Sequence, residues 1–357
     1  MLNLMVAVLY ISDQNMKVMQ ESALLHYAKV FLVTKNQPTL SQDEVSLVFQ
    51  EPGIKSGYRV PNRSWCYYLT SMFHVNNETV NIWSHLIGCI IMAYQLYSYA
   101  CEHDFWTDDR RRVVNIFNMC CVVYTLLSAF AHTIHSKSDH IHYTSFQMDY
   151  GGVGLYTYAT ALVGFYVSCS DEVFYSSVEP FFLPLNTLLA WFSCFSCSLG
   201  KLFYSRPYPF KRKLWNLFSV GGHAVLCCFG SLKRYYNCFL DDECSMSSLQ
   251  HHSVYPMFFF ASIFFFSSHL PERLFPGRFD FVGHGHQLFH VFIVITSCLQ
   301  LYAAESDLNH LNVNFVRTWP TWLHLIMSLA ALLILDFLTI LFLTPFVRQR
   351  IEKDKQH

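Results

Sequence analysis

Two histidines four residues apart, His286 and His290, open a run of apolar residues long enough to cross a bilayer. On a helix this spacing puts both imidazoles on one face, where they can bind a single metal ion. Polar side chains at membrane depth are energetically costly and are usually retained for function. The pair therefore predicts a metal site within a hydrophobic helix.

Other polar side chains lie at the ends of further apolar segments. One segment ends at His132, with Ser128 one helical turn earlier, and the next begins near Asp149. Three histidines leave the fourth position of a zinc ion open for water, which is the pattern of a catalytic zinc. A carboxylate can orient that water or accept its proton, and a hydroxyl can stabilise an oxyanion. The predicted zinc ligands are His132, His286 and His290. The candidate catalytic residues are Asp149 and Ser128.

The alternative interpretation is that these side chains are buried polar residues satisfied by interhelical hydrogen bonds. The positions of these residues in the chain argue against this alternative. If the apolar segments cross a membrane in alternation, His132, Asp149 and the His286 pair all fall at the same membrane face, although they are far apart in sequence. Shared depth is expected of residues that form one site.

A second polar group lies at the start of the first apolar segment. Glu78, Asn81 and His85 are spaced to share one face of a helix. They would either support the metal ligands through hydrogen bonds or fasten helices together, and the spacing alone favours the structural role.

Three more histidines follow His132 in a polar stretch, at His135, His140 and His142. We interpret this stretch as a loop. A loop orients ligands less well than a helix does, so these histidines are not predicted to bind the metal.

The composition indicates a membrane protein. Hydrophobic residues make up 53% of the 357 and charged residues only 14%, whereas soluble proteins have about a quarter charged. Eight apolar segments are long enough to span a bilayer. They are residues 81–100, 113–134, 147–168, 181–200, 214–232, 251–268, 285–303 and 321–347. We predict an all-α polytopic bundle of eight transmembrane helices, with a seven-helix core and a C-terminal eighth. Residues 1–78 form an N-terminal extension, 79–347 the transmembrane domain and 348–357 a tail.

The charges predict the orientation. Eighteen of the 24 Lys and Arg residues fall on the side that carries both chain ends, so the positive-inside rule places the N-terminal extension and the tail in the cytoplasm. Cys238 and Cys244 then share an outer loop, where they could form a disulfide. The net charge of −1 gives no sign of a nucleic-acid partner.

Several separated motifs resemble those of the progestin and adiponectin receptor family. They are Glu78-Thr-Val-Asn-Ile-Trp-Ser-His85, Ser128-x3-His132, Met-Asp149-Tyr-Gly and His286-x3-His290. The stretch from Ser268 to Asp280 resembles the membrane progestin receptor branch. The resemblance implies a helical bundle with zinc near the inner face, bound by the three predicted histidines, with Asp149 holding the zinc-bound water. The branch implies a multi-pass plasma-membrane receptor for progesterone-like steroids that signals through G proteins.

Two functions therefore remain open. One is a steroid receptor in contact with membrane lipids. The other is a zinc-dependent lipid amide hydrolase, because the same pattern of Ser, Asp and His residues resembles that of the alkaline ceramidases. A transporter is disfavoured, since the sequence has no internal repeat and no clear pair of broken helices.

Overall fold

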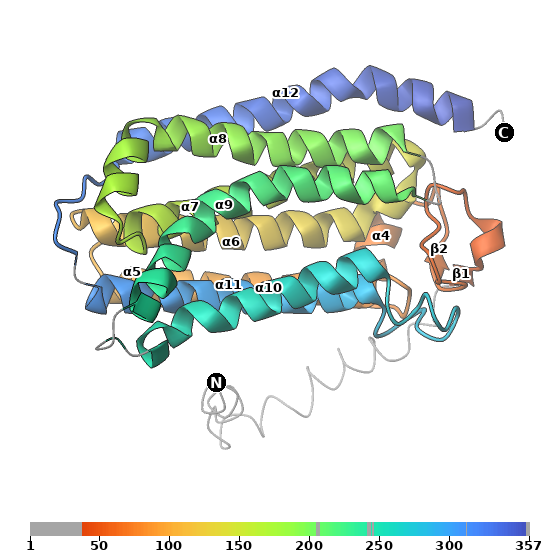
Figure 1. Cartoon of the computed structure of the whole chain (residues 1–357). Coiled ribbons are helices and arrows are strands. Elements are labelled where there is room, and N and C mark those ends of the chain that lie inside the picture. Colours follow the sequence, from red (N-terminus) through yellow and green to blue (C-terminus); the bar gives the residue numbers. More distant parts are fainter. Residues whose placement is uncertain (1–37, 205–207, 241–243, 245, 312, 355–357) are drawn as a thin grey trace, which may run out of the picture.

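A computed structural model of the chain describes residues 38–204, 208–240, 244, 246–311 and 313–354. This part is almost entirely helical, apart from one two-stranded antiparallel sheet (Figure 1). The all-α prediction is confirmed. Residues 1–35, for which the sequence suggested no role, and the last three residues of the predicted tail lie outside the described residues.

Eight long helices form the body of the described structure. They are α5 (Thr79–Glu102), α6 (Asp109–Ile134), α7 (Asp139–Leu162), α8 (Glu172–Phe203), α9 (Phe210–Leu240), α10 (Gln250–Ser268), α11 (Gly285–His310) and α12 (Trp322–Asp354). Each predicted apolar segment overlaps one of them. Most of the helices extend beyond the predicted segment, because a hydropathy pattern does not detect polar residues in the terminal turns.

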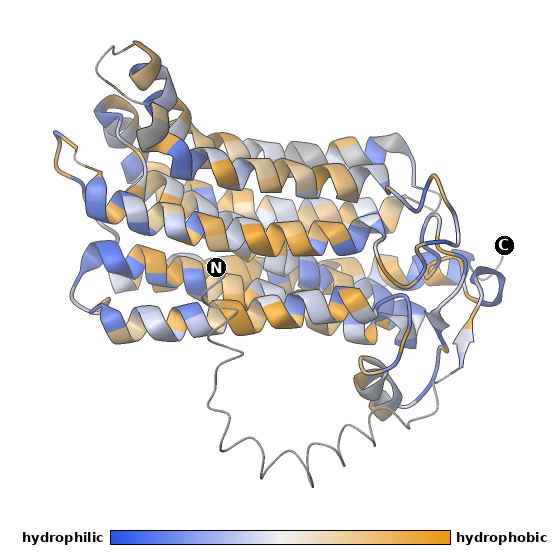
Figure 2. Cartoon of the chain, turned by 90° about the horizontal axis from the view of Figure 1, so that it is seen from below, coloured by the Kyte–Doolittle hydropathy of each residue, from blue (hydrophilic) through white to orange (hydrophobic). Residues whose placement is uncertain are grey.

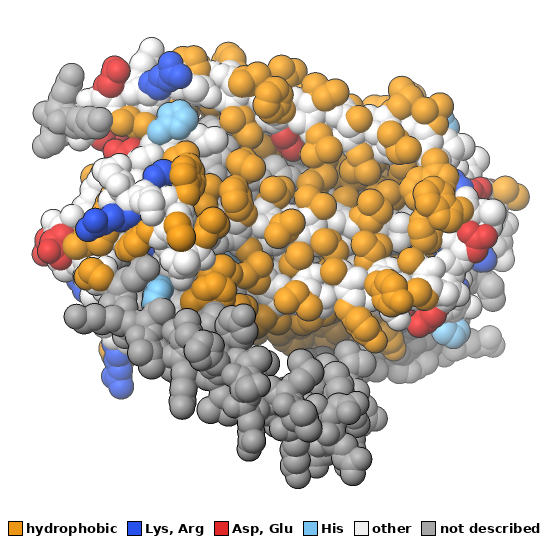
Figure 3. Space-filling model, turned by 180° about the vertical axis from the view of Figure 1, so that it is seen from behind, with side chains coloured by type: hydrophobic (Ala, Val, Ile, Leu, Met, Phe, Trp, Pro, Cys, Tyr) orange, Lys and Arg blue, Asp and Glu red, His pale blue; other side chains and the backbone are white. Residues whose placement is uncertain are grey.

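Five of these helices have the length and hydropathy needed to cross a membrane, namely α5, α6, α8, α11 and α12. The protein is thus a multi-pass membrane protein, whereas the crossing of all eight helices stays a prediction. Hydrophobic side chains cover the middle of the face seen in Figure 3, and charged side chains gather toward its ends. The ribbon shows the same distribution, with hydrophilic residues concentrated toward the helix ends (Figure 2). This is the surface that a bilayer requires.

Successive helices from α5 to α9 pack against one another, and α11 lies between α5 and α10 (Figure 1). α6 is central and α12 peripheral, since 67% of the most apolar part of α6 is buried but only 22% of that of α12. α12 packs on the outside against α7 and α8. A C-terminal helix added to a more compact group agrees with the predicted arrangement.

The described part of the N-terminal extension folds onto one end of the bundle (Figure 1). It contains β1 (Thr39–Leu40), the 3-10 turn η2 (Gln42–Glu44), β2 (Tyr58–Arg59) and the short helix α4 (Trp65–Ser71). Asp280, between α10 and α11, accepts hydrogen bonds from the Lys55 backbone N at 2.9 Å and from the Ser56 hydroxyl at 2.6 Å. The extension is therefore tied to the segment that leads into α11.

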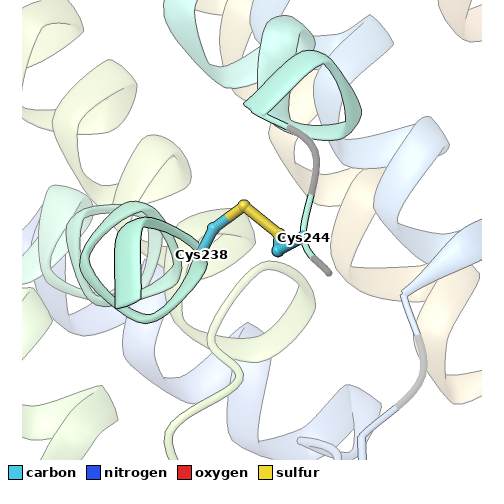
Figure 4. Close-up of a disulfide and its surroundings, with 2 residues drawn as sticks. All are labelled: Cys238 and Cys244. Atoms are coloured by element: carbon cyan, nitrogen blue, oxygen red, sulfur yellow. A yellow bond between two sulfur atoms is a disulfide. The ribbon is translucent and has the colours of Figure 1, made fainter. Parts of the chain in front are cut away.

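The opposite end of the bundle carries a disulfide between Cys238 and Cys244, near the connection from α9 to α10 (Figure 4). The pairing suggested by the sequence is thus present.

Candidate metal centre

The three predicted ligands meet at the end of the bundle that the N-terminal extension covers. His132 lies in the last turn of α6, and His286 and His290 lie in the first turns of α11. One ring nitrogen from each histidine lies within 4.8 Å of the other two. His132 and His290 are buried. Residues 154 positions apart in the chain therefore converge on one point.

The distance between two of the candidate ligands fits a tetrahedral metal. His132 Nε2 and His286 Nε2 are 3.3 Å apart. Two nitrogen ligands of a tetrahedral zinc ion, each about 2.0–2.1 Å from it, are about 3.3–3.4 Å apart. Two imidazole nitrogens that face each other at this distance can share one proton or bind one cation. The donor set and its spacing both suit zinc.

The outer nitrogens of two ligands are held by groups from α5. His132 Nδ1 donates to Glu78 Oε2 at 2.7 Å, and His290 Nδ1 donates to the Asn81 carbonyl at 3.1 Å. Each bond leaves Nε2 as the lone-pair nitrogen directed at the site. Carboxylates and carbonyls behind metal-binding histidines typically have this role. The structure thus places Glu78 and Asn81 around the predicted ligands.

Glu78 also contacts a histidine that the sequence analysis set aside. His135 Nε2 lies 3.1 Å from Glu78 Oε1, and Glu78, His132 and His135 form a second group of ligand atoms within 4.8 Å. The prediction that residues 135–146 form a loop is wrong. His135 is buried in a 3-10 turn, and α7 begins at Asp139, where the Ser138 side chain caps it.

His85, the third member of the predicted support group, lies against a ligand rather than beside the metal position. Its ring stacks on His290, with centroids 3.8 Å apart. Both of its nitrogens are buried, and neither has a hydrogen-bond partner among the described residues. Its contact with the site is therefore through ring packing.

The two candidate catalytic residues lie together near His132. Ser128 is one turn before His132 on α6 and is buried. Its side chain is hydrogen-bonded to Asp149 of α7, which also interacts electrostatically with His132 and Lys201. Within the described structure Asp149 belongs to neither group of close ligand atoms at this end. This position suits a residue that acts on a metal-bound water better than a direct ligand.

Arg59 of β2 joins the N-terminal extension to the site. Its guanidinium donates to the carbonyl oxygens of His132 at 2.7 Å and Thr133 at 2.6 Å. Burial lowers the pKa of Arg59, and the negative charge of Glu78 opposes that effect. A cation at the C-terminal end of a helix is favourable, so Arg59 stabilises the last turn of α6, which carries His132.

The start of α11 is fixed just as tightly. The Gly285 backbone N donates to Glu272 Oε2 at 2.7 Å. A Cβ on Gly285 would lie 2.7 Å from the Phe265 carbonyl oxygen and 2.8 Å from that of Leu270. Only glycine allows this close approach. The turn that carries His286 is consequently anchored against the end of α10.

Fold and site together define a helical multi-pass membrane protein with a buried histidine centre at one end. The model of the family described as "Haemolysin-III related" matches residues 73–301, more than half of the chain. The chain therefore belongs to this family, that of the progestin and adiponectin receptors.

Its relatives carry a more particular name. The chain is 36% identical over 270 residues to "Membrane progestin receptor alpha-B" of Danio rerio and, over the same length, to "Membrane progestin receptor beta" of Homo sapiens. These alignments cover 75% of this chain and 76% of each relative. "Membrane progestin receptor alpha" of Homo sapiens is 30% identical over 316 residues, which are 88% of this chain and 90% of the relative.

Proposed function

We propose that the protein is a plasma-membrane receptor that binds progesterone-like steroids and signals through G proteins. The observation that carries this proposal is the likeness to relatives named membrane progestin receptors, which extends over three quarters or more of the chain. The exposed apolar side chains of the helices would contact membrane lipids.

We also propose that all eight long helices cross the membrane and that the N-terminal extension and the tail are cytoplasmic. The distribution of Lys and Arg supports this orientation. The disulfide Cys238–Cys244 supports it independently, because disulfides persist on the oxidising side of a membrane. In this orientation the histidine centre lies at the cytoplasmic end.

The proposed zinc ligands are His132, His286 and His290. Glu78 and Asn81 hold two of these rings in the tautomer that leaves Nε2 available. A zinc ion bound there would act as a Lewis acid and lower the pKa of a bound water. As a purely structural ion it would join α6 to α11 and stabilise the inner end of the bundle.

A second candidate function is a zinc-dependent lipid amide hydrolase. The contact between Ser128 and Asp149, next to His132, favours it, because a structural zinc needs neither group. In such an enzyme Asp149 would accept a proton from the attacking water and pass it to the departing amine, while the Ser128 hydroxyl would hold the Asp149 carboxylate in place.

Steroid binding is tested with the full chain purified in detergent and titrated with radiolabelled progesterone. The proposal predicts saturable binding that unlabelled progesterone displaces. Heat-denatured protein serves as the control. Binding that does not saturate, in a preparation that elutes as a single species on gel filtration, would contradict the receptor function.

The hydrolase is tested by release of fatty acid from ceramide, with Asp149→Asn as the variant and the exposed Asp43→Asn as the control. Loss of at least about 100-fold in Asp149→Asn alone is expected if Asp149 is the base. Turnover that is the same in wild type and Asp149→Asn, or absent from both, would reject the enzymatic role and leave the receptor proposal untouched.

Glycosylation tests the orientation. The sequence contains two acceptor sequons, Asn62-Arg-Ser64 and Asn77-Glu-Thr79, both before α5. Asn62 is exposed and would be accessible to the glycosylation machinery if it faced the lumen. We expect no mobility shift on glycosidase treatment of protein from mammalian cells. A mobility shift that is lost in Asn62→Gln would show that the N-terminal extension faces the lumen, opposite to the proposed orientation.

A further inference from the structure

A second cluster of histidines lies at the opposite end of the bundle from the proposed zinc centre. It is formed by Arg234 of α9, His251 and His252 in the first turn of α10, and Asp307 near the end of α11. His251 Nε2 is 3.0 Å from Asp307 Oδ1, and His252 Nε2 is 2.8 Å from Asp307 Oδ2. Three helices thus place polar side chains at one point near the disulfide.

The cluster has the composition of a transition-metal site. His251, His252 and Asp307 each offer one ligand atom, and these atoms all lie within 4.8 Å of one another. Two imidazoles and one carboxylate are a set that zinc readily accepts, with the fourth position left open. The Ser231 hydroxyl is 3.2 Å from His252 Nδ1, so it can accept the proton there and leave Nε2 for a metal.

The Arg234 guanidinium lies where a cation would bind. Its NH1 nitrogen is 2.9 Å from each of three atoms: both carboxylate oxygens of Asp307 and Nε2 of His252. One positively charged nitrogen therefore contacts two of the three candidate ligands. A metal ion could bind the full set only if the Arg234 side chain moved aside, and its charge would oppose the ion until it did.

A cavity of about 290 Å³ gives the cluster access to the outside and room for this movement. Five of the six described residues that line it have polar or charged side chains: Arg234, His251, Ser306, Asp307 and His310, with Leu311 as the sixth. A steroid needs a predominantly apolar pocket. This cavity suits a hydrated ion instead.

We propose that His251, His252 and Asp307 form a second site for a divalent transition metal such as zinc, which binds in exchange for the Arg234 guanidinium. The bound ion would join α10 to α11 and release α9 from its ion pair with Asp307. In the orientation proposed above, this site faces the extracellular side. It depends on none of the residues of the histidine centre at the other end.

The test uses the full chain in detergent, with the disulfide intact, titrated with Co²⁺ in equilibrium dialysis and followed by visible absorption. We expect wild type to bind one Co²⁺ weakly beyond any metal that it retains from purification, and added Zn²⁺ to displace it. Arg234→Gln removes the competing charge and should tighten Co²⁺ binding by about tenfold. His251→Ala/His252→Ala should abolish this binding.

Two controls separate this site from the rest of the molecule. His324→Ala removes an exposed histidine from the first turn of α12, outside the cluster, and His286→Ala/His290→Ala removes two ligands of the other centre. His324→Ala should leave this titration unchanged, and the variant of the other centre should still bind Co²⁺ at the cluster. If the double variant in α10 does not elute as a single species, His251→Ala alone, at the partly exposed position, replaces it.

Unchanged Co²⁺ affinity in Arg234→Gln would overturn the exchange with Arg234. Unchanged binding in the folded histidine variants would overturn the site itself. Co²⁺ affinities are compared only among preparations that elute as a single species, because an unfolded chain exposes free cysteines that also bind Co²⁺.

Discussion

The two ends of the bundle use histidine and carboxylate in opposite arrangements. At the end covered by the N-terminal extension, the Glu78 carboxylate lies behind His132 and bonds its Nδ1. The Nε2 atom then faces His286 at 3.3 Å. At the other end the Asp307 carboxylate occupies the centre, where His252 and Arg234 both contact it.

This difference shows what each cluster needs. The Asp307 cluster has its own cation, so its charges are balanced without a metal. In the other cluster the ring nitrogens of His132 and His286 face each other directly, and the Glu78 carboxylate lies behind His132 and orients its ring. The first arrangement is balanced as a set of ion pairs, whereas the second is the one in which we propose that a metal binds. The following predictions, from the largest effect to the smallest, test this contrast.

Asp307→Asn should lower the stability of the protein without affecting zinc binding at the proposed centre at the other end. It leaves the Arg234 side chain, only 11% exposed, without its countercharge, and loss of one partner from a buried ion pair costs about 3–5 kcal/mol. Thermal unfolding in detergent measures this effect. The double variant Asp307→Asn/Arg234→Gln should recover part of the loss, and an unchanged midpoint in the single variant would show that the pair does not stabilise the fold.

Glu78→Gln should weaken zinc binding at the histidine centre by about 10–100-fold, the usual effect of removing a group that orients a ligand. The amide keeps the shape of the side chain but loses the charge that His132 and His135 share. Competition with a chelator of known affinity measures the change. Glu102→Gln, exposed at the far end of α5, is the matched control. Equal zinc affinity in Glu78→Gln and wild type would show that Glu78 links the helices but does not orient a metal ligand.

His85→Phe should leave zinc binding intact and change stability by less than about 1 kcal/mol. The ring that stacks on His290 is kept, and two buried nitrogens without partners in the described structure are removed. Metal analysis and thermal unfolding of the same preparation give both values. Loss of zinc from this variant would make His85 a ligand and revise the proposed coordination.

Much of the fold and of the histidine centre could be predicted from sequence. Long apolar segments specify where helices lie, and a spacing of four places His286 and His290 on one face of α11. His132 could be added because alternating membrane crossings put it at the same depth. For Glu78 the sequence favours a structural role over an orienting one, since a spacing of three and seven residues describes a helix face but not which helix meets it.

The contacts of His135 and of the Asp307 cluster are harder to predict from the sequence. The polar stretch around His135 predicts a loop and so excludes His135, although Ser138 before Asp139 is a helix-capping pattern. The cluster at the other end unites Arg234, His252 and Asp307, which lie 18 to 73 positions apart on three helices. No motif spacing connects them: the packing of α10 against α11 brings His252 to Asp307, and Arg234 reaches both from α9.

The most direct test of the account is the zinc content of the full chain purified in detergent without chelator, compared with His286→Ala/His290→Ala. His324→Ala serves as the control for loss of a histidine elsewhere. The account predicts that the double variant contains about one zinc per chain less than wild type, while the control is unchanged. Equal zinc in wild type and a folded double variant, or no zinc in wild type, would show that the centre is held together by hydrogen bonds alone.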